Sequence, residues 1–275
     1  NDKDWRFNNV APIPKLPFKP NLAPATDNPS KSAVAGLIFG QLPAYRLVFV
    51  NGHFIASLSA IHPQPKGATV VSLAAALNSA DSALIERHLG RYSQLDENPF
   101  SALNTAFFQD GAFIHLPPGT VLNQPVHLVF FSTSTEPGAT SHPRNLILAE
   151  NDSQATILET YVSTVDAPHF TNSVTELVAG ENAVIEHCKF QDESPEAFHV
   201  AALHFNAAAR ANLITHSIAT GARLSRNNIR TSLAGEGVEC ILNGLYLTKG
   251  EQLADHHMVV DHAQPHCNSH EYYNG

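Results

Sequence analysis

QATILE, residues 154–159, is the first of four similar stretches that decide the fold of this chain. The other three are NAVIEH (182–187), RANLIT (210–215) and GVECIL (237–242). Measured at the second residue of each stretch, the spacing is 28, 28 and 27 positions, at Ala155, Ala183, Ala211 and Val238. A second apolar run precedes each stretch, and these runs are NLILA (145–149), SVTEL (173–177), VAALHF (200–205) and IRTSL (229–233). Each repeat unit therefore consists of a strand, a tight turn, a second strand and a longer return.

This short repeat predicts a solenoid. A single unit is too small to bury its own apolar face, so stacked neighbours must share one continuous core. The unit is also too short for a strand–helix–strand repeat, and helical apolar spacing is absent from this half of the chain. We therefore expect a mostly β protein with a parallel β-helix or a related solenoid, and an antiparallel sandwich with evenly recurring hairpins stays open as the alternative. The side chains expected to point inward are Ile147, Val174, Ile185, Leu213, Ile229 and Ile241.

The region before the repeats has a different character. Residues 112–131 read as a first coil, with a turn at Pro117–Gly119, and residues 132–143 read as a polar loop. Proline is dense up to Pro29, which suggests an extended lead-in. We expect a small mixed α/β region over 1–104 and the β-helix core over 105–275. The elements expected before the core are a hairpin over 45–54 that turns at Asn51–Gly52, helix over 70–92, and a helix over 99–111 packed on the core.

Composition excludes several classes of partner. The formal net charge is −9 and there is no Lys/Arg run, so we expect no nucleic-acid binding. No stretch approaches the ~20 apolar residues of a membrane span, and the first residues lack a signal-peptide pattern. The cysteines, Cys188, Cys240 and Cys267, form no C-x-x-C pair, which favours a reducing, cytoplasmic location. We expect Cys188 and Cys240 to be small buried apolar residues.

The stretch DHAQPHCNSHEYYNG (261–275) raises the question of a metal site, because imidazole and thiolate ligate zinc, iron and copper. Pro265 and the turn residues around it indicate a loop between coils, so a structural use of these side chains is favoured over metal binding. Asp255 and His257 are expected to lie one coil earlier and could line a solenoid face. The candidate metal ligands are therefore Asp255, His257, His262, His266 and Cys267.

The sequence contains none of the common catalytic motifs. There is no G-x-x-x-x-G-K-[ST] loop for phosphates, no H-E-x-x-H and no G-x-S-x-G elbow. We expect no catalytic residues. Parallel β-helices also occur in polysaccharide lyases and hydrolases, so such an enzyme is one alternative. A free-standing His/Cys metal-binding protein is the other.

Four segments together resemble the SufB/SufD family of iron–sulfur cluster assembly proteins, and SufD more than SufB. They are DWRFNN (4–9), RLVFVNGHF (46–54), LPPGTVLNQPVHL (116–128) and the long run from Arg226 to Gly275. The resemblance implies a right-handed β-helix and a non-catalytic scaffold subunit. It also implies a SufB-type partner bound through the β-helix, a SufC-type ABC ATPase, and a homodimer when the subunit is alone. No tightly bound cofactor is expected in the isolated chain, and an iron–sulfur cluster or iron would be held transiently in the complex.

The chain departs from the family in one respect. Members of the family carry further β-helix coils and a C-terminal helical region that docks SufC, and a histidine near that end is proposed to face SufB. No residue here matches either feature. We expect the β-helix to be incomplete at its C-terminal end, with the SufC-docking residues and the interfacial ligand beyond Gly275.

Overall fold

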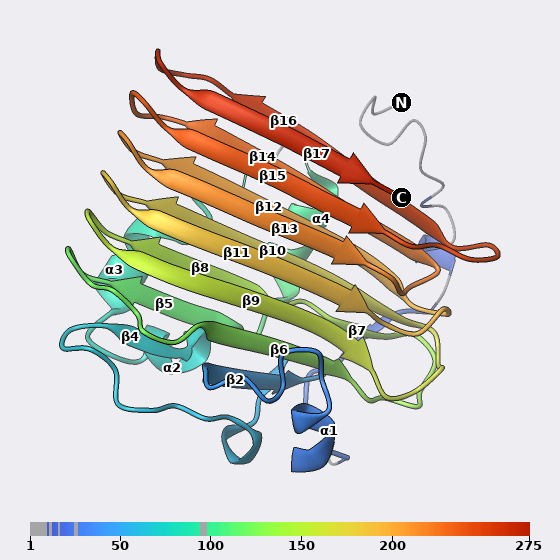
Figure 1. Ribbon diagram of the computed structural model, residues 1–275. Coiled ribbons are helices and arrows are strands. Elements are labelled where there is room, and N and C mark those ends of the chain that lie inside the picture. Colours follow the sequence, from blue (N-terminus) through green and yellow to red (C-terminus); the bar gives the residue numbers. More distant parts are fainter. Residues whose placement is uncertain (1–9, 11–12, 16, 25–26, 94–97) are drawn as a thin grey trace.

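The computed structural model describes residues 10, 13–15, 17–24, 27–93 and 98–275, and it is a parallel β-solenoid of about 6 turns (Figure 1). Two sheets face each other across the core. Sheet A contains, in spatial order, β16 (Leu253–Asp261), β14 (Leu224–Leu233), β12 (Phe198–Ala207), β10 (His169–Ala179), β8 (Arg144–Ala149), β5 (Ala112–Leu116) and β4 (Thr69–Ser72). Sheet B contains β17 (Asn268–Asn274), β15 (Glu239–Tyr246), β13 (Asn212–Ala219), β11 (Val184–Asp192), β9 (Gln154–Ser163), β6 (Val126–Ser132), β2 (Tyr45–Val50) and β3 (His53–Phe54). The predicted parallel solenoid is confirmed, and the antiparallel sandwich is excluded.

The sequence separation between paired residues of neighbouring coils varies around the predicted 28 positions. Val184 of β11 lies opposite Asn212 of β13, 28 positions on, and Asn212 lies opposite Glu239 of β15, 27 positions on. Gln154 of β9, however, lies opposite Val184, 30 positions on. The stacking of Ala155 on Ala183 is therefore wrong, because the β9–β10 return is two residues longer than the β11–β12 return. Length differences are absorbed in the returns and, by one residue, in the turn between β14 and β15, so the strands keep their alignment.

Side-chain alternation places four of the six predicted inward residues in the core. Ile147, Ile185, Leu213 and Ile229 belong to one apolar cluster between the sheets. Two predictions are wrong. Val174 lies opposite Arg144 and shares its outward face, where it is buried outside the lumen. Ile241 also points outward, because its neighbours Cys240 and Leu242 are the buried, inward residues of β15.

The hairpin over 45–54 is confirmed. β2 and β3 are antiparallel, and the turn between them uses positive φ at Asn51 (49°) and Gly52 (89°), as an Asn–Gly turn requires. β2 also pairs in parallel with β6, so this strand continues the sheet B stack. The predicted helix over 70–92 is instead β4 followed by α2 (Leu73–Leu77) and α3 (Ser82–His88). The reason is Ser72, which ends the strand and caps α2 by accepting a hydrogen bond from Ala75 N.

The loop expected over 132–143 contains a short strand, β7 (Ala139–Ser141), which pairs with β10 and with β1 (Lys19–Pro20) of the lead-in. The lead-in is therefore extended but also held against sheet A. The remaining short elements are α1 (Lys31–Ala35) and the 3-10 turns η2 (Ile13–Lys15) and η3 (Ala56–Leu58). The family-like segment at 4–9 lies outside the described residues.

Helices cover the outward face of sheet A. Residues of α2 and α3 pack on Phe113, Leu146 and Leu148 of that face. Helix α4 (Pro99–Phe107) packs on β10, as predicted, and Asn104 Nδ2 donates to the carbonyls of Pro143 and Asn172. No helix within the described ranges has both the length and the apolar character needed to cross a membrane.

A buried ion pair fastens the segment after α3 to the same face. Arg144 Nη2 lies 2.6 Å from Glu176 Oε2, and both side chains are almost fully buried. The Glu176 carboxylate also accepts hydrogen bonds from the backbone N–H groups of Gly90, Tyr92 and Ser93. All of its acceptor sites are thus used to hold this loop on sheet A.

Candidate functional site: a polar column inside the solenoid

The space between the two sheets has an apolar half and a polar half. The apolar half is lined by the first inward residues of the sheet B strands, such as Ala155, Ile185 and Leu213. The polar half, which we call the polar column, is lined by the next inward residues of these strands and by their counterparts on sheet A. It comprises the buried side chains of Glu159, Tyr161, His169, Thr171, Thr175, His187, Lys189, Gln191, Glu193, His199, Thr215, Ser217 and Asn227.

Glu159 is one anionic centre of the polar column. Its Oε1 lies 2.8 Å from Thr175 Oγ1 and 3.3 Å from His187 Nε2, and its Oε2 accepts from Tyr161 OH at 2.8 Å. Burial by itself would raise the pKa of this carboxyl, but the hydrogen bond and charge of His187 and the two hydroxyl donors lower it to about 2. Glu159 is therefore ionised although it is enclosed.

Glu193 is the second anionic centre. Its Oε2 lies 2.6 Å from His199 Nδ1, its Oε1 accepts from Thr171 Oγ1 at 2.5 Å, and Gln191 Nε2 donates to Oε2 at 3.1 Å. His169 Nε2 is 3.6 Å from Oε1. Burial would raise the Glu193 pKa, but the two imidazoles hold it well below the usual value.

The pKa values of the two imidazoles at Glu193 are shifted in opposite directions. Burial and then the charge of Lys189 lower the pKa of His199. For His169, burial acts in the same direction, but the hydrogen bond and charge of Glu193 outweigh it and raise the pKa. His169 is therefore the more readily protonated of the pair.

Lys189 is the cation of the polar column. Its Nζ lies 3.4 Å from Asn227 Oδ1 and 5.2 Å from the centre of the Tyr161 ring. Burial lowers its pKa to about 8, although the nearby charges of Glu159 and Glu193 act in the opposite direction. Such a group gains or loses its proton close to neutral pH. The polar column is therefore a buried lining of interacting charged and polar groups, and it is too enclosed to receive a macromolecule.

The structure separates the metal-ligand candidates into two places. His262, His266 and Cys267 lie in the turn between β16 and β17, whereas Asp255 and His257 lie on the outward face of β16. Asp255 pairs with the buried Arg226 at 2.5 Å. Throughout the described part of the chain, no three His, Cys, Asp or Glu side chains are grouped so that they could hold a metal ion.

The turn residues have structural contacts. His266 adopts a φ of 60°, and the corresponding turns of the earlier coils have positive φ at Asp152, Asn182, Arg210 and Gly237. Backbone hydrogen bonds connect these turns, for example from Gly237 N to Pro265 O. His262 Nε2 lies 3.0 Å from Ser269 Oγ, and Cys267 Sγ is 3.2 Å from Gly235 O. These residues continue a ladder of turns along one edge of the solenoid.

The cysteine predictions have a mixed outcome. Cys240 is fully buried among the apolar core residues, as expected. Cys188 is only half-buried and points outward from β11, so its assignment to the core is wrong. Of the neighbours His187 and Cys188, His187 is the one that points inward. Burial still raises the pKa of the Cys188 thiol to about 11, so this thiol is protonated at neutral pH.

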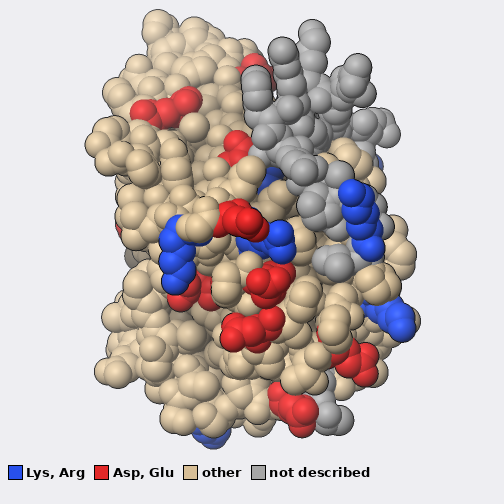
Figure 2. All heavy atoms as spheres, turned by 90° about the vertical axis from the view of Figure 1, so that its right-hand side faces the viewer, with Lys and Arg blue, Asp and Glu red and all other residues tan. Residues whose placement is uncertain are grey.

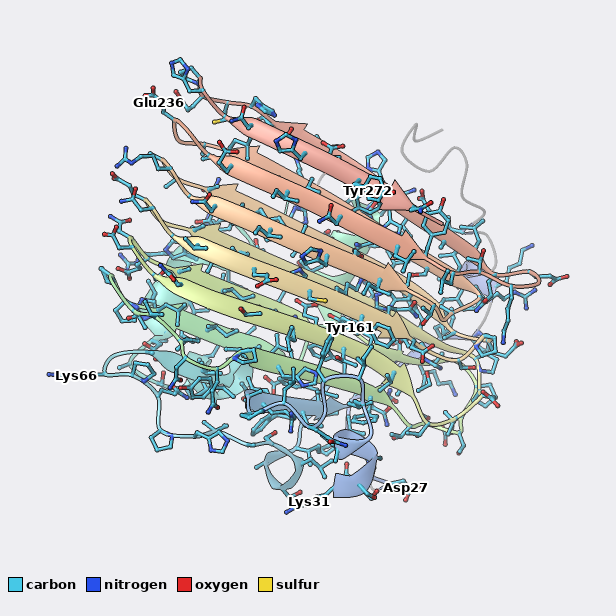
Figure 3. The ribbon with its side chains drawn as sticks, viewed as in Figure 1. Asp27, Lys31, Lys66, Tyr161, Glu236 and Tyr272 are labelled. Atoms are coloured by element: carbon cyan, nitrogen blue, oxygen red, sulfur yellow. The ribbon has the colours of Figure 1, made fainter. Side chains whose placement is uncertain are left out.

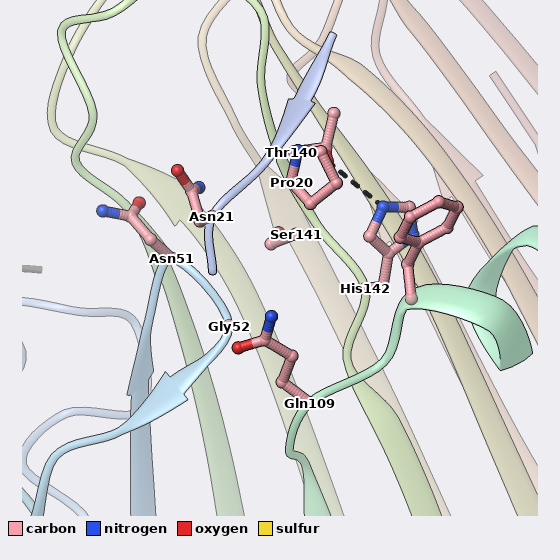
Figure 4. Close-up of a pocket in the computed structure, with 9 residues that line it drawn as sticks. Pro20, Asn21, Asn51, Gly52, Gln109, Thr140, Ser141 and His142 are labelled. Carbon is pink, nitrogen blue, oxygen red and sulfur yellow. Dashed lines mark hydrogen bonds between the residues drawn. The ribbon is translucent and has the colours of Figure 1, made fainter. Parts of the chain in front are cut away.

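Two of the hollows outside the solenoid differ sharply in size. One, shown in Figure 4 between β1, β7 and the β2–β3 turn, has a volume of about 10 Å³, which is the size of one water molecule. The other, of about 630 Å³, lies between α4 and the lead-in, and its lining is almost entirely apolar, with Thr140 and His142 as exceptions. Neither contains the paired ionisable groups that the polar column has.

Comparison with known proteins places the chain among iron–sulfur assembly proteins. A family model described as "SUF system FeS cluster assembly, SufBD core domain" matches residues 130–275, and one described as "SufBD protein N-terminal region" matches residues 4–128. An iron–sulfur cluster assembly SufBD family protein of Synechocystis is 29% identical over 273 residues, which is 96% of this chain and 59% of the relative. The Escherichia coli iron–sulfur cluster assembly protein SufD is 26% identical over 230 residues, 83% of this chain and 51% of SufD. The chain thus spans little more than half the length of these relatives.

Proposed function

Because this chain belongs to the SufBD family of iron–sulfur cluster assembly proteins, we propose that it acts as a SufD-like scaffold subunit in that assembly. One observation carries this proposal: the N-terminal and core models of the family match consecutive parts of the chain and leave almost none of it uncovered. The role is non-catalytic. The polar column suits it, since buried groups with fixed partners keep the sheets in one arrangement.

The proposed partners are a SufB-type subunit, which would pair through the β-helix, and a SufC-type ABC ATPase. The absence of a phosphate-binding loop from the sequence is consistent with ATP hydrolysis by a partner. The complex would work in the cytoplasm, and the subunit would form a homodimer when alone. No cofactor is bound tightly, and iron or an iron–sulfur cluster is cargo of the complex.

Reconstitution tests this function. The full-length gene product would be co-expressed with a SufB-type protein and a SufC-type ATPase from the same organism, and complex mass would be measured by light scattering after size exclusion. A complex of all three proteins, with cluster formation that requires this subunit, is the expected result. Failure to bind either protein, together with cleavage of an acidic polysaccharide, would replace the scaffold with an enzyme.

A further inference from the structure

The two sheets differ in how their outward faces are covered. Helices α2, α3 and α4 lie on sheet A, whereas β11, β13, β15 and β17 of sheet B carry no helix or loop within the described residues (Figure 1). We call the outward side chains of these four strands the open face. Its apolar members are Val184, Cys188, Phe190, Ile214, Ile218, Ile241, Leu245 and Tyr272.

The apolar residues of the open face are partly exposed. Tyr272, labelled in Figure 3, is 68% exposed, and Leu245 is 39% exposed. Phe190, Ile214 and Ile241 are half-buried by their neighbours on the flat sheet. Monomeric proteins rarely expose contiguous apolar patches, and those with a polar rim mark contact surfaces. Apolar residues in this arrangement would lose their remaining contact with water under a partner.

The charge of the open face has one sign. Three exposed carboxylates project from it, those of Glu186, Asp192 and Glu239, and none of the outward positions of these strands holds Lys or Arg. Glu239 accepts from the neutral Asn268 Nδ2 at 2.7 Å, and Asp192 accepts from Thr220 Oγ1 at 3.0 Å. Among the described residues, the nearest basic group to Glu186 is the imidazole of His216, at 3.9 Å.

Another side of the molecule shows the opposite arrangement. On the face in Figure 2, Lys and Arg side chains lie beside Asp and Glu. In such a pairing, Arg223 is 3.9 Å from Glu196 and 3.4 Å from Glu251. The carboxylates of Glu196 and Glu251 thus have a basic partner within the chain, whereas those of the open face are available to a partner's cations.

We propose that the open face docks a protein whose own surface presents Lys or Arg side chains around an apolar centre. Three carboxylates without Lys or Arg partners favour such a surface and repel nucleic acid, anionic membranes and a second copy of the same face. The proposal rests on the scaffold function above in one respect. The partner is sought in the native cells of this protein, where it would take part in cluster assembly.

Photocrosslinking of the full-length protein in its native cells tests the proposal. Ile214→p-benzoylphenylalanine is expected to yield an adduct with one other protein, and the same amino acid at Glu86 of α3 serves as the control for random contact. The adduct should disappear in the triple variant Glu186→Lys/Asp192→Lys/Glu239→Lys. A matched triple variant, Asp27→Lys/Glu86→Lys/Glu136→Lys, adds the same charge elsewhere and should keep it.

The partner identified in this way would then be purified and titrated against the full-length protein. The expected result is a Kd raised about tenfold or more by the open-face triple variant and by higher salt, with the matched variant unchanged. No adduct above the Glu86 control would overturn the proposal, as would an adduct within the same chain, to a second copy or to nucleic acid. Circular dichroism and thermal unfolding check that both triple variants fold. Complex formation with the SufB-type and SufC-type proteins is measured separately, so the scaffold function can stand if the docking proposal fails.

Discussion

Glu159 is the residue at which the interior of this protein differs most from an ordinary solenoid core. An ionised carboxylate is stable there because Thr175 and Tyr161 donate hydrogen bonds to it and His187 Nε2 lies 3.3 Å from it. Glu159→Gln keeps the shape but leaves His187 without its anionic partner. We expect it to lower the free energy of unfolding by about 3 kcal/mol, as loss of one partner of a buried pair does. Urea denaturation at pH 7 measures this, and Glu86→Gln on the exposed surface of α3 is the control, expected to change little.

The pH dependence of Glu159 follows from the same contacts. Its folded-state pKa of about 2 lies below the usual value of 4.5, so its contribution to stability is complete above the unfolded value. The contribution is lost as the pH falls through the window between these values. We expect Glu159→Gln to lose less stability than the wild type between pH 5 and pH 2, at about 25 °C in urea titrations. Parallel curves for the two proteins would contradict this.

Lys189 makes a prediction of the same sign in a higher pH window. Burial lowers its pKa from 10.5 to about 8, so between these values the unfolded chain binds more protons than the folded one. Stability contributed by this group should therefore rise with pH across that window. We expect the wild type to gain stability relative to Lys189→Met between pH 8 and pH 10.5. An unchanging difference between the two proteins over this range would show that Lys189 titrates normally.

The polar column was not predicted from the sequence, although a signal for it exists. In β11, His187, Lys189 and Gln191 alternate with outward residues, so they continue the inward series that begins at Ile185. Apolar side chains mark a core in a sequence, and the inward residues of the polar half of each strand lack this mark. The prediction that His266 lies in a turn rested on its neighbour Pro265, which is a local signal. The partners of Glu193 come from two sheets, so they depend on the stacking register, which is not local.

At the scale of elements, the turn between β2 and β3 is fixed by its residues. Gly52 has a φ of 89°, a conformation that costs an L-residue about 1 kcal/mol or more. We expect Gly52→Ala to lower stability by about 1–2 kcal/mol. Gly36→Ala is the control, because Gly36 ends α1 at a φ of −77°, which any residue adopts. Equal losses of stability for Gly52→Ala and Gly36→Ala in thermal unfolding would argue against a positive φ at Gly52.

The loop after α3 depends on Glu176. Its carboxylate holds Arg144 and three backbone N–H groups, and Gln in its place offers one acceptor oxygen and no charge. We expect Glu176→Gln to increase hydrogen exchange at Gly90, Tyr92 and Ser93 by tenfold or more, at about 1.4 kcal/mol per tenfold. The amides of β11, on the opposite sheet, should keep their protection. Uniform loss of protection would indicate global destabilisation in place of a released loop.

At the scale of the whole molecule, the repeat predicted the architecture but not its register. The number of residues per coil varies because the returns differ in length, and no local pattern revealed that the β9–β10 return is two residues longer. The helical region was harder to predict, since the break between β4 and α2 depends on a capping contact of Ser72. Periodic burial is visible in a sequence, whereas contacts between distant segments are not.

The central claim is that segments about 28 positions apart lie side by side and parallel, and a disulfide between neighbouring coils tests it most directly. Glu186 and Ile214 lie opposite each other on β11 and β13. In a Cys188→Ser background, Glu186→Cys/Ile214→Cys is expected to form a disulfide under mild oxidation, because paired strands bring Cα atoms within about 4.4–6.8 Å. Glu186→Cys/Ile218→Cys, displaced by four residues or roughly 13 Å along β13, should remain reduced. Closure of the displaced pair while the opposed pair stays open would contradict the parallel stack.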